Sequence, residues 1–325
     1  MKDFFHLLKD GNRSSLIAAV VNVILGVVKG VAFFFSGNVA LFAEMMHSLG
    51  DAANQFFVFI GSALSKKAPT AQFPKGFGRL VNLVCLGAVL IVAILSYETI
   101  KEGWHHMLNP TSSGGFWISI IVLSIGVVLE FIVLFKAAQE IAHEVGVDHA
   151  GLRTLPIAFR EMGNAKPATK LVFMEDFVAT FGGILALSAI VLAKFTGWHA
   201  VEGAASIVIG LMMFYVVGRV FLDNARGVLG ETDEEMLNHI AYLVLDHPDI
   251  VDIEKLEVIK EGEFLHVECI AEVSPDHTLA YLDDVRDHLT DILLSQKNVN
   301  RVAIAFDEDD GEAEWVHRAA RPLMN

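Results

Sequence analysis

Six apolar stretches of about the length that crosses a bilayer fill the first two thirds of this 325-residue chain. The hydrocarbon core of a membrane is about 30 Å thick, and a helix needs roughly 20 apolar residues to span it. Hydrophobic residues make up 54% of the chain and charged residues only 19%, which is typical of a membrane protein. The stretches are 16–35, 39–64, 80–95, 116–135, 171–192 and 201–221. The sequence therefore predicts a membrane protein with six transmembrane α-helices.

The pattern becomes that of a small, soluble α+β domain after Gly230. The expected elements are a helix from Asp233 to just before Pro248, strands at 254–260 and 264–273 joined at Glu261–Gly262, a helix at 279–295 and a strand at 299–306. This αββαβ order is close to a ferredoxin-like arrangement. We therefore expect a transmembrane domain at 1–229, a cytoplasmic domain at 230–308 and a poorly ordered acidic tail at 309–325.

The net charge of −15 comes mainly from this second part of the chain, where acidic residues are dense between 231 and 310. Such a surface disfavours nucleic acid and suits cations. Cys85 lies in the third apolar stretch and Cys269 in a predicted strand. Neither a disulfide framework nor a thiolate zinc site is therefore expected, and no permanently bound cofactor is expected.

Basic residues are concentrated in alternate loops, which predicts the orientation of the chain in the membrane. The basic segments contain Lys2, Lys9 and Arg13; Lys66, Lys67, Lys75 and Arg79; and Arg153, Arg160, Lys166 and Lys170. The opposite loops, at 36–38, 104–115 and 195–198, have almost none. Since basic loops stay on the cytoplasmic side, both termini are expected there. The first residues do not read as a cleaved secretory peptide, so we expect a multi-pass protein of a bacterial inner membrane.

Ionisable side chains inside two of the apolar stretches mark a candidate metal site. Each charged group costs about 2.5 to 3.5 kcal/mol at the centre of a membrane helix, so such groups are usually functional. His47 and Asp51 are four residues apart and share one face of a helix, as does Asn54. An imidazole with carboxylate oxygens suits Zn²⁺, and also Mn²⁺, Fe²⁺ or Co²⁺.

The fifth stretch carries two adjacent carboxylates, Glu175 and Asp176. Adjacent residues point about 100° apart on a helix, so both cannot easily reach one ion. Asp176 is the stronger candidate, and Glu175 is either a second ligand or a solvated residue near the helix end. Val172, one turn before Asp176, supplies no ligand atom.

Other polar residues near the spans each allow two interpretations. Lys29 and Glu130 are either groups on an ion pathway or partners that join two helices. His199 and Glu202, at the start of the sixth stretch, either contact metal on its way out or cap the helix. The His105–His106 pair is expected in an exposed loop.

The second stretch reads Ala43-Glu-Met-Met-His47-Ser48-Leu-Gly-Asp51-Ala-Ala-Asn54-Gln55. Its His-Ser-x-x-Asp motif, placed in the second of six spans and followed by an αββαβ domain, resembles the signature of the cation diffusion facilitator family of divalent-metal transporters. The segment Gly76-Phe-Gly78-Arg79 follows in family order, and the resemblance covers nearly the whole chain. It implies a metal efflux transporter rather than an enzyme, with Zn²⁺ as the first choice of substrate.

The chain departs from the commonest pattern of that family at one ligand position. Most members have His or Asp four residues before the fifth-span Asp, where this chain has Val172. The segment Met174-Glu175-Asp176-Phe177-Val178-Ala179 is instead similar to the branch containing the animal mitochondrial zinc transporter and its bacterial relatives. The resemblance then implies a metal held by His47, Asp51 and Asp176, with Asn54, Glu175 or water completing the shell. Such an oxygen-rich shell weakens the inference of zinc in particular.

Metal sites outside the membrane are expected to be reduced relative to the family pattern. Phe77 stands between the loop glycines where relatives often have His. In the C-terminal domain the resemblance places Glu268, Ala305 and Asp307 at positions where the family binds bridging metals. His266 and His277 lie nearby in the sequence and are expected to be solvated surface residues.

Proton-coupled antiport by alternating access, in a homodimer that meets through the C-terminal domains, is what the resemblance implies. A physical basis exists in the residues themselves, because ligands must lose their protons to bind metal. An intramembrane metalloenzyme would need an activated water beside a general base, often as His-Glu-x-x-His, which the chain lacks. A membrane-anchored metal sensor would leave Asp51 and Asp176 without a role, and a channel would not favour tightly binding paired ligands.

Overall fold

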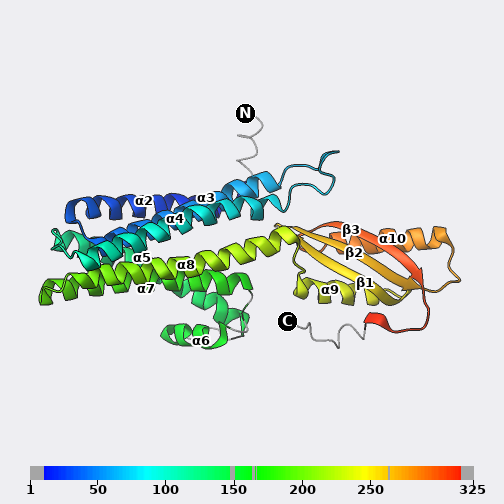
Figure 1. Ribbon diagram of the computed structural model, residues 1–325. Coiled ribbons are helices and arrows are strands. Elements are labelled where there is room, and N and C mark those ends of the chain that lie inside the picture. Colours follow the sequence, from blue (N-terminus) through cyan, green and yellow to red (C-terminus); the bar gives the residue numbers. More distant parts are fainter. Residues whose placement is uncertain (1–10, 147–150, 163–164, 166, 263, 316–325) are drawn as a thin grey trace. The chain divides into compact units, whose positions relative to one another are not determined.

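A computed structural model describes the chain except for residues 1–10, 147–150, 163–164, 166, 263 and 316–325. Six of the helices that it describes are 24 to 30 residues long. They are α2 (Arg13–Ser36), α3 (Val39–Ser65), α4 (Leu80–Leu108), α5 (Phe116–Glu144), α7 (Pro167–Thr196) and α8 (Ala200–Leu229) (Figure 1). Each predicted apolar stretch therefore lies in one long helix.

Five of these helices are long and apolar enough to cross a membrane, within the residues that the structure describes. The sixth, α3, has the required length, but its most apolar stretch is less apolar than those of the other five. Glu44, His47 and Asp51 lie within it, so the candidate site itself lowers the hydropathy of this span. The prediction of a six-helix membrane domain with a small α+β domain is confirmed.

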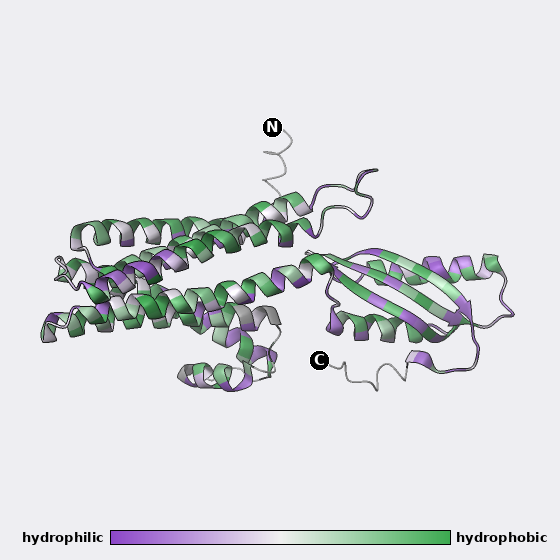
Figure 2. Ribbon diagram, viewed as in Figure 1, coloured by the Kyte–Doolittle hydropathy of each residue, from purple (hydrophilic) through white to green (hydrophobic). Residues whose placement is uncertain are grey.

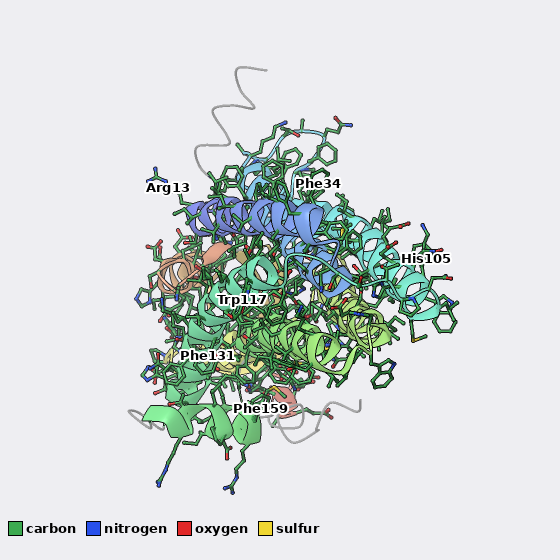
Figure 3. All side chains as sticks on the ribbon, turned by 90° about the vertical axis from the view of Figure 1, so that its left-hand side faces the viewer. Arg13, Phe34, His105, Trp117, Phe131 and Phe159 are labelled. Atoms are coloured by element: carbon green, nitrogen blue, oxygen red, sulfur yellow. The ribbon has the colours of Figure 1, made fainter. Side chains whose placement is uncertain are left out.

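The long helices are coloured mostly as hydrophobic in Figure 2, and many of their large apolar side chains are exposed. Phe34 is 82% exposed and Trp117 is 72% exposed, and both project from the helices in Figure 3. A water-soluble domain rarely exposes a contiguous apolar surface of this kind. These faces are therefore suited to contact with lipid.

A short irregular helical segment between α5 and α7 was not predicted. It contains η2 (Gly151–Arg153) and α6 (Thr154–Glu161). Ala158 is fully buried, and the ring of Phe159 contacts that of Phe173 with centroids 5.0 Å apart. These contacts help to fix the first turns of α7, where Glu175 and Asp176 follow Phe173 by two and three residues.

The C-terminal elements form the predicted αββαβ arrangement. They are α9 (Glu234–Leu245), β1 (Ile250–Glu261), β2 (Phe264–Val273), α10 (Leu279–Leu294) and β3 (Val299–Glu308). The strand order is β1-β2-β3, with β1 antiparallel and β3 parallel to β2. Alternate strand residues and one face of each helix meet in a core that includes Ile240, Val267 and Leu289.

The acidic tail keeps contact with this domain further than expected. The backbone N–H groups of Glu314 and Trp315 donate to Oδ2 of Asp252 at 2.7 and 3.4 Å, and Trp315 packs against the apolar core. These contacts attach the described part of the tail, as far as residue 315, to the domain, and the predicted limit of the tail stays a prediction. Residues 316–325 lie outside the described part.

The described chain divides into two compact units whose boundary crosses α3, α4 and α8. One unit comprises Gly11–Ile60 and Val84–Asp223. The other includes Gly61–Leu83 and the described part of Asn224–Asn325. All the candidate membrane ligands belong to the first unit, so the site is formed within a single body. The domain limits at 229 and 308 stay predictions.

Candidate metal site

His47 and Asp51 form a closely spaced pair on α3. Nε2 of His47 lies 3.4 Å from Oδ2 of Asp51. His47 is only 7% exposed and its Nε2 has no hydrogen-bond partner, whereas the Asp51 side chain is 46% exposed. Two ligand atoms that are each about 2.0–2.1 Å from a tetrahedral Zn²⁺ lie about 3.3 Å apart. The helix therefore holds these two atoms at the separation that one divalent ion requires.

Asp176 and Glu175 on α7 lie in the same region as this pair. Their carboxylates are close enough to Asp51 for the charges to interact. Oδ2 of Asp176 is buried and has no hydrogen-bond partner. Such an atom is costly unless something fills its place. The structure thus places an unsatisfied carboxylate of α7 within range of the charge of Asp51 on α3.

These residues do not form a closed shell of ligands. In the part of the chain that the structure describes, no three His, Cys, Asp or Glu side chains converge closely enough to hold a metal ion. Asn54 is half-buried on α3, one turn beyond Asp51. Val172 is 49% exposed and offers no ligand atom. The arrangement is a two-atom half-site on α3, with a separate unpartnered carboxylate on α7.

A buried charge network lies one helical turn from His47. Nζ of Lys29 on α2 donates to Oε2 of Glu44 on α3 at 2.9 Å and to Oε1 of Glu130 on α5 at 3.0 Å. Lys29 and Glu44 are each 1% exposed. The interpretation of Lys29 and Glu130 as partners that join helices is therefore the one that the geometry supports.

Glu44 is the member of this network that sequence reasoning missed. The signal was available, because Glu44 is an acid within an apolar stretch and lies three residues before His47, on the same helix face. The other oxygens of the two acids, Oε1 of Glu44 and Oε2 of Glu130, have no hydrogen-bond partner. They lie against Gly182 and Gly183 of α7, where a Cβ atom would stand 3.0 and 3.2 Å away.

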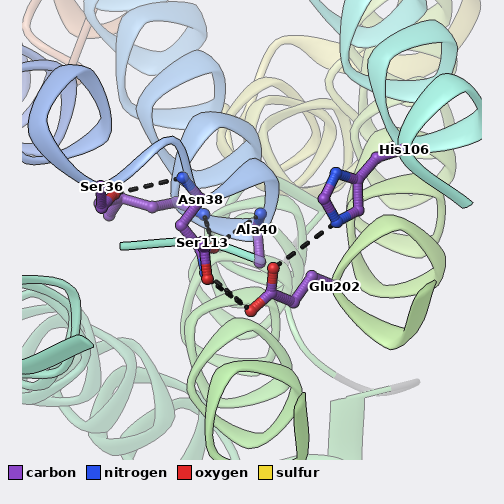
Figure 4. Close-up of polar contacts among 7 residues, drawn as sticks. Ser36, Asn38, Ala40, His106, Ser113 and Glu202 are labelled. Atoms are coloured by element: carbon purple, nitrogen blue, oxygen red, sulfur yellow. Dashed lines mark hydrogen bonds and ion pairs between the residues drawn. The ribbon is translucent and has the colours of Figure 1, made fainter. Parts of the chain in front are cut away.

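A second polar network joins the helix connections at one end of the bundle (Figure 4). Oε1 of Glu202 on α8 accepts hydrogen bonds from Nδ2 of Asn38 at 2.9 Å and from Oγ of Ser113 at 3.1 Å. Asn38 lies between α2 and α3, and Ser113 between α4 and α5. Oδ1 of Asn38 also accepts from the N–H groups of Ala40 and Leu41, which caps α3.

His106 belongs to this network, and its predicted place in an exposed loop is wrong. Helix α4 continues to Leu108, well beyond the apolar stretch that predicted it, so both histidines are helical. Since neighbouring residues point about 100° apart, His105 is exposed whereas His106 is only 6% exposed. Nε2 of His106 lies 3.6 Å from Oε2 of Glu202.

Replacing Asn38 by Asp is expected to destabilise the protein. The new carboxylate keeps the acceptor that caps α3 but loses the N–H donor to Glu202, and it sets two acids against each other in a buried place. Loss of a buried hydrogen bond with an unpaired partner costs about 1–3 kcal/mol. A lower melting temperature of the detergent-purified variant would show this effect. Asn109→Asp, at an exposed position after α4, is the matched control and should melt like the parent.

His266 in the C-terminal domain is buried rather than solvated, contrary to expectation. It is 4% exposed, and its Nε2 lies 3.4 Å from Oε1 of Glu268. Burial lowers the pKa of His266 from its ordinary value, while the charges of Glu261 and Glu268 act in the opposite direction. His277 is partly exposed and its ring stacks on Tyr281. Nothing in this geometry assigns a metal to the domain.

Comparison with known proteins places the membrane part of the chain in a defined group. The pattern of the cation efflux transmembrane domain matches residues 15–229, which include all six long helices but the first two residues of α2. The candidate ligands on α3 and α7 all lie within the match.

Similar proteins include several that are named for zinc. The human mitochondrial proton-coupled zinc antiporter SLC30A9 is 23% identical over 263 residues, which cover 78% of this chain and 44% of that protein. The zinc transporter ZitB of Escherichia coli (strain K12) is 24% identical, over 88% of this chain and 86% of its own. Metal tolerance protein C4 of Arabidopsis thaliana is 25% identical, over 78% of this chain and 55% of that protein. The chain thus spans less than half the length of the antiporter that it matches.

Proposed function

Because this chain belongs to the cation efflux family, we propose that it carries a divalent metal cation out of the cytoplasm, bound at His47, Asp51 and Asp176. The single observation that carries this proposal is the 3.4 Å separation of His47 Nε2 and Asp51 Oδ2, two atoms that can ligate one ion. The unpartnered Oδ2 of Asp176 supplies a third donor from another helix. Asn54, Glu175 or water would complete the shell.

Zn²⁺ is the substrate that we propose first. A His nitrogen with carboxylate oxygens is a common zinc ligand set, and two of the relatives are named zinc carriers. With few nitrogen donors and no thiolate, the same set would also accept Mn²⁺, Fe²⁺ or Co²⁺. A competition assay among these four ions would therefore identify the substrate.

Exchange of metal for protons is the mechanism that this ligand set favours. His47 and the two aspartates bind metal only when deprotonated, so protons and metal exclude one another. The site is nearly neutral with either cargo, but it carries uncompensated negative charge when empty and ionised. An uncompensated charge is expensive inside a membrane. The protein can therefore switch between its inward-open and outward-open conformations when the site holds metal or protons. It cannot easily switch when the site is empty and ionised.

The network of Lys29, Glu44 and Glu130 would assist this cycle by its charge. Glu44 lies three residues before His47 and shares one amine with Glu130. In a medium of low dielectric constant, an ionised acid beside the site attracts a divalent cation strongly. Because Lys29 bonds to both acids, it also holds α2, α3 and α5 in register around the half-site.

The topology follows from the basic loops. We propose that both termini are cytoplasmic and that the membrane is a bacterial inner membrane. We also propose that two chains associate through their C-terminal domains. Since membership of a transporter family accounts for Asp51 and Asp176, an intramembrane metalloenzyme is the weaker alternative.

A transport assay in proteoliposomes tests the proposal. Vesicles that contain the purified protein should accumulate zinc when their interior is more acidic than the medium. Protons should leave the vesicles as zinc enters. Asp176→Ala should reduce uptake to the level of empty vesicles, whereas Glu98→Ala, the same change at an acid that pairs with Lys101 on the surface of α4, should keep most of it. Metal uptake that neither depends on the proton gradient nor alters it would refute antiport, and equal uptake by both variants would refute the ligand assignment.

A further inference from the structure

His106 and Glu202 form a second His–carboxylate pair, far along the bundle from His47. Nε2 of His106 and Oε2 of Glu202 are 3.6 Å apart, and neither atom has a hydrogen-bond partner. The two side chains are 8% and 1% exposed. Polar atoms buried this deeply are nearly always satisfied in folded proteins. Two unsatisfied atoms that face each other therefore point to a missing third partner between them.

The surrounding residues hold Glu202 in place for such a partner. Its other oxygen, Oε1, already accepts hydrogen bonds from Asn38 and Ser113 (Figure 4). These bonds fix the direction of Oε2, which is left for a ligand. A carboxylate with one oxygen bonded to neutral donors and the other free is typical of a metal ligand supported by its neighbours.

Close contact between α4 and α8 brings the pair together. A Cβ atom at Gly103 would stand 2.7 Å from the carbonyl oxygen of Gly203, so both glycines are needed for this approach. Gly103 lies one turn before His106, and Gly203 directly follows Glu202. The helices thus touch at the level where the two ligand atoms meet, and a shift of one helix along the other would separate them.

The spacing and chemistry of the pair resemble those of the half-site on α3. The nitrogen–oxygen distance is 3.6 Å here and 3.4 Å between His47 and Asp51, against about 3.3 Å for two ligands of a tetrahedral zinc ion. His199, directly before α8, adds a buried Nδ1 without a hydrogen-bond partner. A site with one or two imidazoles and a carboxylate suits zinc better than magnesium or calcium.

We propose that His106 and Glu202 form a second binding site for a divalent cation with a preference for nitrogen and oxygen ligands, with water or His199 completing the shell. This inference rests on the proposed transport function, because it gives the cation a place to bind on the outer side after it leaves His47 and Asp51. The outer site joins the helix connections that meet at this end, so a bound ion would also bridge α4 to α8.

Zinc binding to the full-length protein in nanodiscs tests this proposal without requiring transport. The background variant is Asp51→Asn with Asp176→Asn, which removes the first site. Glu202→Gln is added to it in one sample and His106→Gln in another, and equilibrium dialysis counts the zinc bound per chain. Glutamine keeps an acceptor for Asn38 and Ser113, so the fold should be preserved, which melting temperatures check. His105→Gln, an exposed neighbour on the same helix, is the matched control.

Both outer-site variants should bind one zinc ion fewer per chain than the background, or bind it about tenfold more weakly or worse. His105→Gln should bind as much zinc as the background does. Any zinc bound by histidines of the C-terminal domain is the same in every sample, so it does not affect the comparison. If well-folded Glu202→Gln and His106→Gln samples bind as much zinc as the background, the outer site does not exist. A failure of the parent protein to transport zinc would instead count against the proposed function, and the binding result would stand apart from it.

Discussion

Replacing Asp51 by Asn should abolish metal transport while leaving the protein folded. Asparagine has the same shape, but its amide carries no charge and is a poor ligand for a divalent ion. Loss even of a residue that only supports a ligand commonly costs 10- to 100-fold in metal affinity, so loss of a ligand itself should cost about 100-fold or more. Initial rates of zinc uptake into proteoliposomes, measured over a range of zinc concentrations, provide the comparison.

The control for this change is Glu98→Gln, the same chemical change on an exposed acid of α4. Glu98 pairs with Lys101 at the surface, at 3.0 Å, and lies outside both proposed sites. Its variant should transport at the parental rate. If Asp51→Asn also transports at that rate, His47 and Asp51 do not carry the ion. Size-exclusion profiles check that both variants are folded.

Replacing Lys29 by Met should strongly destabilise the protein. Met removes the ammonium group and leaves Glu44 and Glu130 buried without their shared donor. Breaking a buried ion pair from one side costs about 3–5 kcal/mol, because the remaining charge stays uncompensated. The free energy of unfolding in mixed detergent micelles, obtained from denaturant titration, should fall by that amount.

Two further variants distinguish the effect of breaking the buried network from the effect of losing a lysine. Lys101→Met removes an exposed lysine that also bonds to an acid, Glu98, and surface pairs of this kind contribute little. Its unfolding curve should overlay that of the parent. Adding Glu44→Gln and Glu130→Gln to Lys29→Met removes the stranded charges and should restore most of the stability. If Lys29→Met is as stable as the parent, the network does not hold the three helices together.

The sequence was sufficient for much of the fold because its strongest signals are simple. Apolar stretches predicted every long helix, and alternation predicted the second strand of the β1–β2 hairpin. Helix ends were less predictable: α4 extends to Leu108, beyond the apolar stretch that ended at residue 95. The added turns carry charged and aromatic residues that suit a membrane surface, so hydropathy alone places the end too early. That error put His106 in a loop.

The candidate site was predictable only where its residues are close in sequence. His47 and Asp51 share a helix, so their four-residue spacing fixes their meeting. The meeting of Lys29 with Glu130, 101 residues apart, and of His106 with Glu202 depends on which helix faces which other helix. A hydropathy pattern carries no information on that choice. Glu44 lies three residues before His47, so the same spacing rule places both on one face of α3.

The polar composition of α3 has a consequence for how this protein enters a membrane. Glu44, His47 and Asp51 all oppose insertion of α3 as an isolated segment, since each charged group near a span centre costs about 2.5 to 3.5 kcal/mol. Only Gly37 and Asn38 separate α3 from the strongly apolar α2, and Lys29 of α2 bonds to Glu44 at 2.9 Å. Insertion of the two helices together, as a hairpin, would bring this amine and this acid into the bilayer already paired. The residues that would later hold the cargo thus make α3 dependent on α2 during biosynthesis.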